Sequence, residues 1–419
     1  MLTFILPVSP RAKNIIAFLL ALFVAGCAAP RATAADSREC VTAIGDVHGD
    51  FDDFVGILRH TGLIDAQNHW TGGKTTLVQL GDLLDRGPKG RDVMDLVMAL
   101  QEEAPAAGGQ VVNLLGNHEV MNIMGDLRYV TPENYARFAD ADSEARRKSA
   151  FQNYMKWRTA HSALLAELPQ PVFEVTEAEW IARHPAGFVE QRDALGPKGI
   201  YGKWLRGRPA VTSIQGIIFL HGGLDPKMGS LSIDGVNNRI HDELKSFDDA
   251  KAYLVEEKLI LPFFTLQEIS AVVQAELMAE RKSLVSSSQQ RQAKLGDFLH
   301  YGDWISMRAD GPLWFRGYDQ WSEEEGLQQI DKVLNNYKAA HIAVGHTVQK
   351  GGHIRTRFAG KVFLIDTGML ASYYPGGKAS ALEISCEKNK FIAEYMDEHV
   401  VLLGDAVEHP ESGNSVSAH

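Results

Sequence analysis

Residues 76–87 read TLVQLGDLLDRG, a short apolar run that ends in glycine and is followed by two aspartates and an arginine. Apolar runs bounded by glycine are typical of buried β-strands, so these polar residues stand where a strand ends and a loop begins. In an open α/β sheet, ligands bind outside the carboxyl ends of the strands. This stretch therefore predicts an α/β fold with a polar site at one edge of its sheet.

Four other stretches also consist of an apolar run followed by polar residues. Residues 41–49 (VTAIGDVHG), 111–119 (VVNLLGNHE), 217–223 (IIFLHGG) and 342–347 (IAVGHT) each place polar residues directly after an apolar, β-branched run. The side chains delivered are carboxylates, an amide and imidazoles, which are oxygen and nitrogen ligands of divalent metals. In chain order, the candidate metal ligands are Asp46, His48, Asp82, Asn117, His221 and His346.

The spacing of the first three motifs fits two successive βαβ units. Asp46, Asp82 and Asn117 are separated by similar intervals, each longer than the roughly 30 residues that a strand, a crossover helix and two loops need. Residues 91–102 have the apolar face of such a helix. The three side chains are therefore expected side by side.

The ordered motifs resemble the calcineurin-like metallophosphoesterases, and the sequences at 85–87 (DRG) and 345–347 (GHT) resemble their phosphoprotein phosphatase branch. Further stretches are similar to the bacterial and plant group called Shewanella-like protein phosphatases, and together the resemblance covers roughly residues 40–395. It implies a two-sheet β-sandwich flanked by helices, with mainly helical insertions. The further stretches are 121–130 (MNIMGDLRYV), 311–317 (GPLWFRG), 365–369 (IDTGM) and the pair Tyr373-Tyr374.

The resemblance also implies a role for each candidate ligand in the hydrolysis of phosphate esters by two divalent metal ions. Asp82 would bridge the two ions. Asp46 and His48 would join it on the first ion, and Asn117, His221 and His346 on the second. Two such ions about 3.5–4 Å apart supply a nucleophile and neutralise charge on the phosphoryl group. Mn²⁺ is the first expectation, and Fe or Zn²⁺ are the alternatives because they accept the same ligands.

Four further assignments follow from the same resemblance. His118 would protonate the leaving oxygen as a general acid, with Asp85 orienting its ring. Arg86 and Arg316 would bind the substrate phosphate, which a guanidinium grips through two parallel hydrogen bonds. Two alternatives stay open: Asp85 pairs with Arg86 or caps the next helix, and Arg316 stacks on Trp314 as ordinary surface packing.

Composition narrows the class of function. The 419 residues carry a formal net charge of −11, which argues against a general nucleic-acid binder. We expect a phosphoprotein phosphatase with a preference for phosphotyrosine, acting on phosphorylated proteins or peptides. One alternative is a small-molecule phosphatase for nucleotides or dinucleoside polyphosphates, and another is a lipid-anchored metal-binding protein without turnover.

The N-terminus indicates export. Arg11 and Lys13 precede an apolar run, 15–24, that is too short for a membrane span but suits a secretory signal. Residues 24–27 (VAGC) resemble a bacterial lipobox, so we expect a signal peptide over 1–26 and lipidation at Cys27. Cleavage after 32–34 (ATA), which would release a soluble secreted enzyme, is the alternative. Lipidation at Cys27 predicts a periplasmic or cell-envelope lipoprotein.

The remaining chain divides into a tether at 27–38, a catalytic domain at 39–404 and a polar tail at 405–419 expected to be disordered. Mainly helical insertions are predicted near 131–210 and 245–300, either to shape specificity or only to cover the sheet. An exported protein can form disulfides, so Cys40 and Cys386 are either bridged or two free thiols.

Overall fold

The computed structural model describes residues 40–404, apart from 167, 169–171, 174–175, 229–230, 283–288 and 386–389. The predicted signal peptide, tether and tail lie outside these described residues, and so does Cys27. The described residues all belong to one compact unit. Within the described part of the chain, none of the helices combines the length and hydropathy that crossing a bilayer requires.

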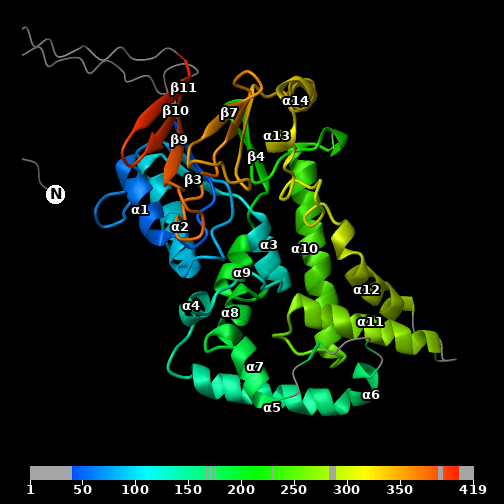
Figure 1. The fold of residues 1–419 in the computed structure, drawn as a ribbon. Helices are drawn as coiled ribbons and strands as arrows, with labels where there is room; N and C mark the ends of the chain where they lie inside the picture. Colours follow the sequence, from blue (N-terminus) through cyan, green and yellow to red (C-terminus); the bar gives the residue numbers. More distant parts are fainter. Residues whose placement is uncertain are drawn as a thin grey trace, which may run out of the picture. The chain divides into compact units, whose positions relative to one another are not determined.

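The first sheet contains the three N-terminal strands in parallel, as the two predicted βαβ units require (Figure 1). Helices α1 (Phe51–His60) and α2 (Gly90–Glu103) are the crossovers, and α2 matches the helix predicted at 91–102. Three antiparallel strands extend the sheet on the other side of β1. Its strand order is β11 (His399–Leu403), β10 (Phe391–Tyr395), β9 (Ser380–Ile384), β1 (Val41–Ile44), β2 (Thr76–Gln79) and β3 (Gln110–Asn113).

The second sheet carries the two later motifs. Strand β5 runs parallel to β6, and β6 runs parallel to β8, so the residues that follow β5 and β6 meet at one edge. The outer strands β4 and β7 are antiparallel to their neighbours. The order is β4 (Val211–Ile214), β5 (Ile217–Leu220), β6 (His341–Val344), β8 (Val362–Leu364) and β7 (Arg355–Arg357).

The two sheets pack face to face, which confirms the predicted sandwich. Val41 and Val78 of the first sheet share one buried apolar cluster with Phe219 and Phe363 of the second. Because side chains alternate along a strand, Ile44 faces the other way and joins a second cluster with α1 and α2. Burial on both faces explains why apolar residues predominate in β1, β5 and β8.

Helical segments occupy both predicted insertions and lie on the side of α3 (Asn117–Met124) and α10 in Figure 1. Thr131 caps α4 by accepting the backbone N–H of Asn134. The second helical segment begins at Ile233, upstream of residue 245, because Ser232 caps α10. The helices are α4 (Pro132–Ala136), α5 (Ser143–Ala160), α6 (Ser162–Leu165), α7 (Glu177–Arg183), α8 (Phe188–Leu195), α9 (Ile200–Arg206), α10 (Ile233–Glu256), α11 (Leu266–Lys282) and α12 (Gln289–Leu299).

Two short helical elements precede β6, α13 (Gly317–Gln320) and α14 (Glu323–Tyr337). At the start of the described chain, Cys40 stands directly before β1 and is disulfide-bonded. The other two cysteines, Cys27 and Cys386, lie outside the described residues. The alternative in which Cys40 and Cys386 are two free thiols is therefore wrong.

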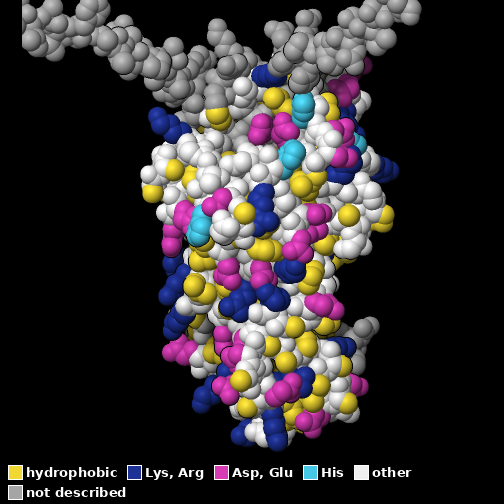
Figure 2. Space-filling model, turned by 90° about the vertical axis from the view of Figure 1, so that its left-hand side faces the viewer, with side chains coloured by type: hydrophobic (Ala, Val, Ile, Leu, Met, Phe, Trp, Pro, Cys, Tyr) yellow, Lys and Arg dark blue, Asp and Glu magenta, His cyan; other side chains and the backbone are white. Residues whose placement is uncertain are grey.

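One face of the molecule is shown in Figure 2. Lys and Arg side chains alternate there with Asp and Glu side chains over the described surface. Interspersed charges of both signs produce no extended field of one sign on that face.

Candidate metal centre

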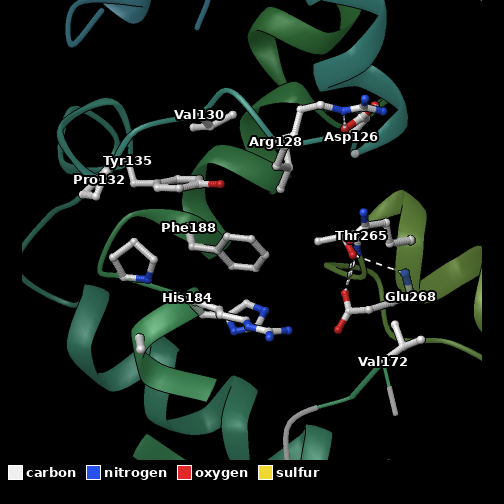
Figure 3. Close-up of a pocket in the computed structure, with 16 residues that line it drawn as sticks. Asp126, Arg128, Val130, Pro132, Tyr135, Val172, His184, Phe188, Thr265 and Glu268 are labelled. Carbon is white, nitrogen blue, oxygen red and sulfur yellow. Dashed lines mark hydrogen bonds and ion pairs between the residues drawn. The ribbon is translucent and has the colours of Figure 1, made fainter. Parts of the chain in front are cut away.

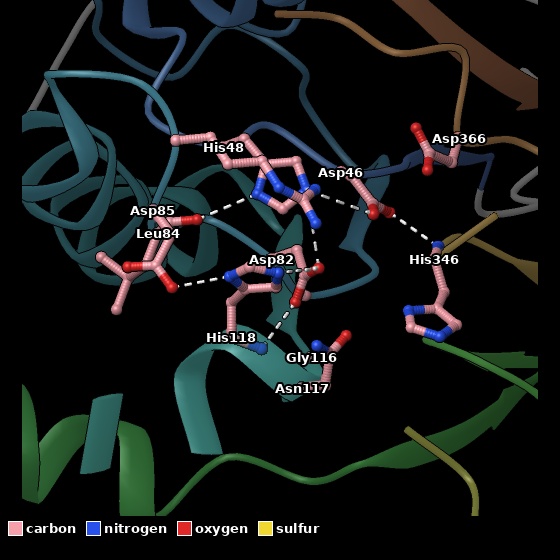
Figure 4. A network of polar contacts seen from close by, with 12 residues as sticks. Asp46, His48, Asp82, Leu84, Asp85, Gly116, Asn117, His118, His346 and Asp366 are labelled. Carbon is pink, nitrogen blue, oxygen red and sulfur yellow. Dashed lines mark hydrogen bonds and ion pairs between the residues drawn. The ribbon is translucent and has the colours of Figure 1, made fainter. Parts of the chain in front are cut away.

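The five loops that follow β1, β2, β3, β5 and β6 converge at one edge of the sandwich. The six candidate ligands that they carry are all buried, with exposed fractions from 0% for His221 to 7% for His346. The loop after β6 is tied to the loop after β1, because the backbone N–H of His346 donates to Asp46 Oδ1 at 2.9 Å (Figure 4). The structure thus brings together the whole set that the sequence predicted.

One group of ligand atoms surrounds His48. Its Nε2 lies 3.7 Å from Asp46 Oδ2 and 3.6 Å from Asp82 Oδ2. Its Nδ1 donates to the carbonyl of Leu84 at 3.0 Å, which leaves the Nε2 lone pair directed at the carboxylates. His48, Asp82 and His118 offer ligand atoms within 4.8 Å of one another. We call His48, Asp82 and Asp46 the first cluster.

A second cluster lies on the other side of Asp82 and contains Asn117, His221 and His346. His221 Nε2 is 3.2 Å from Asp82 Oδ2 and 2.9 Å from Asn117 Oδ1. Its Nδ1 contacts the carbonyl of Leu80 at 2.9 Å, so Nε2 is the nitrogen that can bind a metal. His346 contacts the carbonyl of Trp314 through Nε2 at 3.1 Å, so its Nδ1 is the available atom.

Asp82 belongs to both clusters through the same oxygen, Oδ2. That is the position expected of a carboxylate shared by two ions. Burial would raise the pKa of Asp82, but the neighbouring imidazoles of His221 and His118 outweigh it and hold that pKa well below its usual range. Asp82 is therefore ionised at neutral pH and available as a ligand.

The fit to divalent cations rests on carboxylate oxygens that lack hydrogen-bond partners. Among the described residues, Asp46 Oδ2, Asp82 Oδ2 and Asp366 Oδ2 are buried and accept no hydrogen bond. Burial and the nearby Asp366 raise the pKa of Asp46, and burial raises the pKa of Asp366 to about 6. Buried, unpaired carboxylates are costly unless cations neutralise them, so the donor set fits divalent metal ions.

Asp366 is a site residue that the sequence reasoning missed. It follows β8 in the stretch IDTGM, at the same strand-to-loop position as the five motifs. It is 1% exposed and lies beside Asp46 in Figure 4. The run of apolar residues before it was the signal that could have identified it.

The predicted acid and its orienting carboxylate are in contact. His118 Nδ1 donates to Asp85 Oδ2 at 2.6 Å, and both side chains are 1% exposed. Burial lowers the pKa of His118, but Asp82 and Asp85 more than compensate and raise it above its usual value. The carboxylate of Asp85 binds His118 and Asn122, not Arg86, so the alternative pairing with Arg86 is wrong.

Arg86 stands beside the first cluster, with its guanidinium in contact with His48 Nε2. Three tyrosine rings surround the guanidinium carbon, at 5.4 Å for Tyr129, 5.3 Å for Tyr373 and 5.5 Å for Tyr374. Cation–π contacts of this kind hold a guanidinium without consuming its hydrogen-bond donors. The arginine can therefore present donors to an anion in front of the cluster.

Arg316 stands beside the second cluster. Its Nη1 donates to the carbonyl of His346 at 3.0 Å and to Thr347 Oγ1 at 3.1 Å. Trp314, expected as a stacking partner, instead packs edge-on against the His346 ring at 5.9 Å. Arg316 is solvent-exposed, so the remaining donors of its guanidinium are accessible to solvent and to a ligand.

The site stores backbone strain that no sequence pattern reveals. His48, Asp82, Asp85, Arg86 and His346 all have positive φ, between 49° and 70°. Residues with a Cβ rarely adopt this conformation, and it clusters at functional sites where the surroundings enforce it. Two glycines allow the close packing around these residues: a Cβ at Gly116 would collide with Asp82 Oδ1, and one at Gly345 with Asp46 Oδ1.

Glu119 supports the loop that carries Asp82 and Asp85. Its buried carboxylate accepts the backbone N–H groups of Asp82 at 2.7 Å, Leu83 at 2.9 Å and Gly116 at 2.8 Å. The residue was part of a predicted motif but was assigned no role. These contacts show that Glu119 fixes the loop after β2 against the loop after β3.

A separate cavity of about 330 Å³ lies among the helical segments. In Figure 3, Tyr135, Phe188 and His184 line one side of it, and Thr265 and Glu268 line the other. None of the six candidate ligands borders it. It is therefore distinct from the candidate metal centre.

Comparison with known proteins agrees with this geometry. Residues 41–350 match the family model of the calcineurin-like phosphoesterases. An uncharacterised protein of Schizosaccharomyces pombe is 29% identical over 84% of this chain and 80% of its own length. Shewanella-like protein phosphatase 1 of Plasmodium berghei is 27% identical over 78% of this chain and 67% of its own. The crystal structure of a cold-active protein tyrosine phosphatase from a psychrophilic Shewanella species shares the fold, with a TM-score of 0.52 at 22% identity over 87% of this chain and 81% of that one.

Proposed function

This chain belongs to the calcineurin-like phosphoesterase family and is a metal-dependent phosphatase, and we propose that it removes phosphate from tyrosine residues of phosphorylated proteins. One observation carries the proposal: the His118–Asp85 pair stands against a carboxylate, Asp82, that two clusters of metal-ligating atoms share. A general acid beside a pair of metal sites is the arrangement that phosphate monoester hydrolysis needs.

In the proposed reaction, different residues of the chain bind the phosphate and protonate the leaving group. Two divalent ions, when bound, supply the nucleophile and part of the charge neutralisation. Arg86 and Arg316 flank the two clusters, so they bind and orient the phosphate from both sides. His118 Nε2 lies 3.9 Å from Asp82 Oδ2 and gives its proton to the leaving oxygen, while Asp85 holds Nδ1–H and fixes the ring.

Aromatic side chains at the site support an aryl phosphate as substrate. The Tyr129 ring lies 5.1 Å from the ring of His118, and Tyr129 is 36% exposed. Tyr373 is 49% exposed and packs on Tyr374, whose ring is 6.3 Å from that of His48. The leaving group must pass next to His118, where a phenol ring can stack on Tyr129 and a serine side chain cannot. The Plasmodium relative is named a protein phosphatase and the Shewanella protein a protein tyrosine phosphatase, which supports a phosphoprotein substrate.

Two further proposals concern the metal and the location. Mn²⁺ is the proposed native ion, with Fe or Zn²⁺ as alternatives, because imidazole, amide and carboxylate ligands accept all three. Residues 1–26 are proposed as a signal peptide, with Cys27 lipidated and the enzyme held at the membrane of the cell envelope.

The deciding experiment uses purified mature protein whose metal content has been measured. It would be assayed with tyrosine-phosphorylated peptides, serine-phosphorylated peptides, nucleotides and a dinucleoside polyphosphate. We expect the highest kcat/KM for the tyrosine-phosphorylated peptides. Faster hydrolysis of nucleotides would favour the small-molecule alternative, and absence of turnover with two bound metals would favour a binding protein.

A further inference from the structure

Asp85 has a second hydrogen-bond partner besides His118. Its Oδ2 accepts from His118 Nδ1, whereas its Oδ1 accepts from Asn122 Nδ2 at 2.8 Å. Asn122 lies one helical turn after His118 on α3, and the same amide group donates to the carbonyl of His118 at 3.0 Å. Asn122 is 1% exposed, so no solvent competes for these bonds.

The amide orientation of Asn122 is determined by its surroundings. Asp85 Oδ1 and the His118 carbonyl can only accept hydrogen bonds, so the NH₂ group must face them. The opposite end, Oδ1, accepts from Gln191 Nε2 at 3.3 Å. A flipped amide would set an oxygen against a carboxylate, where no hydrogen bond can form.

Gln191 comes from the first helical insertion. It is 1% exposed on α8, and its neighbour Arg192 donates through Nη1 to the backbone carbonyl of Asn122 at 2.6 Å. Helix α8 therefore holds both the side chain and the main chain of Asn122. This insertion contacts the acid through a continuous chain of hydrogen bonds, rather than only covering the sheet.

We propose that Asn122, held by Gln191, is a positioning residue that fixes the Asp85 carboxylate and so aims the His118 ring at the leaving oxygen. The proposal rests on the proposed function, because it assigns His118 the role of acid. Without Asn122, the Asp85 carboxylate would keep a single described partner and could rotate about its last side-chain bond. His118 would then lose its defined ring orientation while its metal-binding neighbours stayed in place.

The test compares Asn122→Ala and Gln191→Ala with Asn237→Ala as matched control. Asn237 on α10 also uses its amide to accept from the backbone N–H of Val211 and to donate to its carbonyl, but it touches none of the acid residues. Asn122→Ala should lower kcat for a tyrosine-phosphorylated peptide roughly ten- to hundredfold, the loss expected for a removed hydrogen bond to a charged group. Nitrophenyl phosphate hydrolysis, KM and metal content should change little.

Double variants sharpen this test. In a His118→Asn background, Asn122→Ala should have no further effect on kcat, because the group that it positions is gone. Gln191→Ala should show the same leaving-group pattern at smaller amplitude, and Asn237→Ala should show none. Equal losses for both substrates, or additive losses in the double variant, would overturn the proposal.

A second readout does not require turnover. In protein loaded with diamagnetic Zn²⁺ and labelled with ¹⁵N-histidine, the hydrogen-bonded Nδ1–H of His118 should give a downfield proton signal, identified by its loss in His118→Asn. That signal should disappear or move in Asn122→Ala and persist in Asn237→Ala. An unchanged signal in Asn122→Ala contradicts the positioning role. Lack of wild-type phosphatase activity would contradict only the proposed function.

Discussion

The backbone N–H of His346 donates to Asp46 Oδ1 at 2.9 Å, although the two residues are 300 positions apart. This bond joins the loop after β6 in one sheet to the loop after β1 in the other. The metal centre is therefore assembled across the sandwich, and neither sheet contains it alone. Asp82 then connects the two clusters through one oxygen.

Asp82→Asn should remove nearly all activity because it weakens both clusters at once. Changes to the outer partners of metal ligands typically cost about 10–100-fold, so loss of a shared ligand should exceed that. Asp46→Asn should weaken mainly the first cluster. Metal content per chain and kcat/KM measure both effects, with the exposed Asp249→Asn as control. Normal metal content and turnover in Asp82→Asn would exclude its bridging role.

His118→Asn should slow substrates in proportion to the basicity of their leaving group. A general acid contributes on the order of 10²–10⁴-fold when the leaving oxygen needs a proton. Nitrophenyl phosphate should be affected least, phosphotyrosine more and phosphoserine most, and Asp85→Asn should show the same order at smaller amplitude. Steady-state kcat for the three substrates measures this order. One common factor for all three, with metal content intact, would mean that His118 does not protonate the leaving group.

Arg86→Lys should raise KM and lower kcat together. The substitution keeps the charge but loses the planar fork that binds phosphate and stacks on three tyrosines, so kcat/KM should fall roughly tenfold or more. Arg316→Lys should act in the same direction more weakly, since Arg316 is exposed. Arg59→Lys, on the far end of α1 from the site loops, is the control. Kinetics of Arg86→Lys that match the wild type would show that Arg86 does not touch phosphate.

The Asp366 carboxyl should destabilise the metal-free protein as the pH rises. Burial raises the pKa of Asp366 from 3.8 to about 6, so the folded state binds this proton more tightly than the unfolded chain does. Its contribution to stability is then complete below pH 3.8 and is lost as the pH rises through about 6. In the presence of a chelator, the Tm of the wild type should therefore fall more, or rise less, between pH about 5 and neutral pH than the Tm of Asp366→Asn, because the lowered pKa values of buried His48 and His346 act in the opposite direction in both proteins.

Asp366→Asn should reduce that pH dependence, because an amide has no proton to lose. Added Mn²⁺ should raise the Tm of the wild type most at neutral pH, where the carboxylates are ionised. If wild type and Asp366→Asn show the same change in Tm between the two pH values, the Asp366 carboxyl is not the group responsible.

Cys27→Ala should abolish membrane association. If Cys27 is lipidated, the wild type should partition with membranes and incorporate labelled fatty acid, because the acyl chains supply the anchoring free energy. Fractionation and mass spectrometry of the mature N-terminus measure this. A soluble mature protein that begins near Ala35 would instead support the simple signal peptide.

Much of the site could be predicted because each motif is local. A buried strand followed by a polar loop is visible in residues 76–87, and the order of such motifs was enough to indicate the six ligands. Strand ends were less accurate: residues 111–115 were predicted, whereas β3 spans Gln110–Asn113. The backbone N–H of Leu115 donates to the carbonyl of Pro209 and not to the neighbouring strand β2. No local sequence pattern indicates this distant partner.

Local hydrophobic pattern and spacing predicted the α/β class and the two βαβ units, and motif chemistry indicated six candidate ligands. The pairing of His118 with Asp85 was implied by the family resemblance. The folded chain was needed to show that Asp366 lies beside Asp46, that five site residues adopt positive φ, and that α8 reaches Asn122. These features depend on which segments pack together after the chain folds. Contacts between distant residues, such as Asn122 with Gln191, leave no periodic signal in the chain.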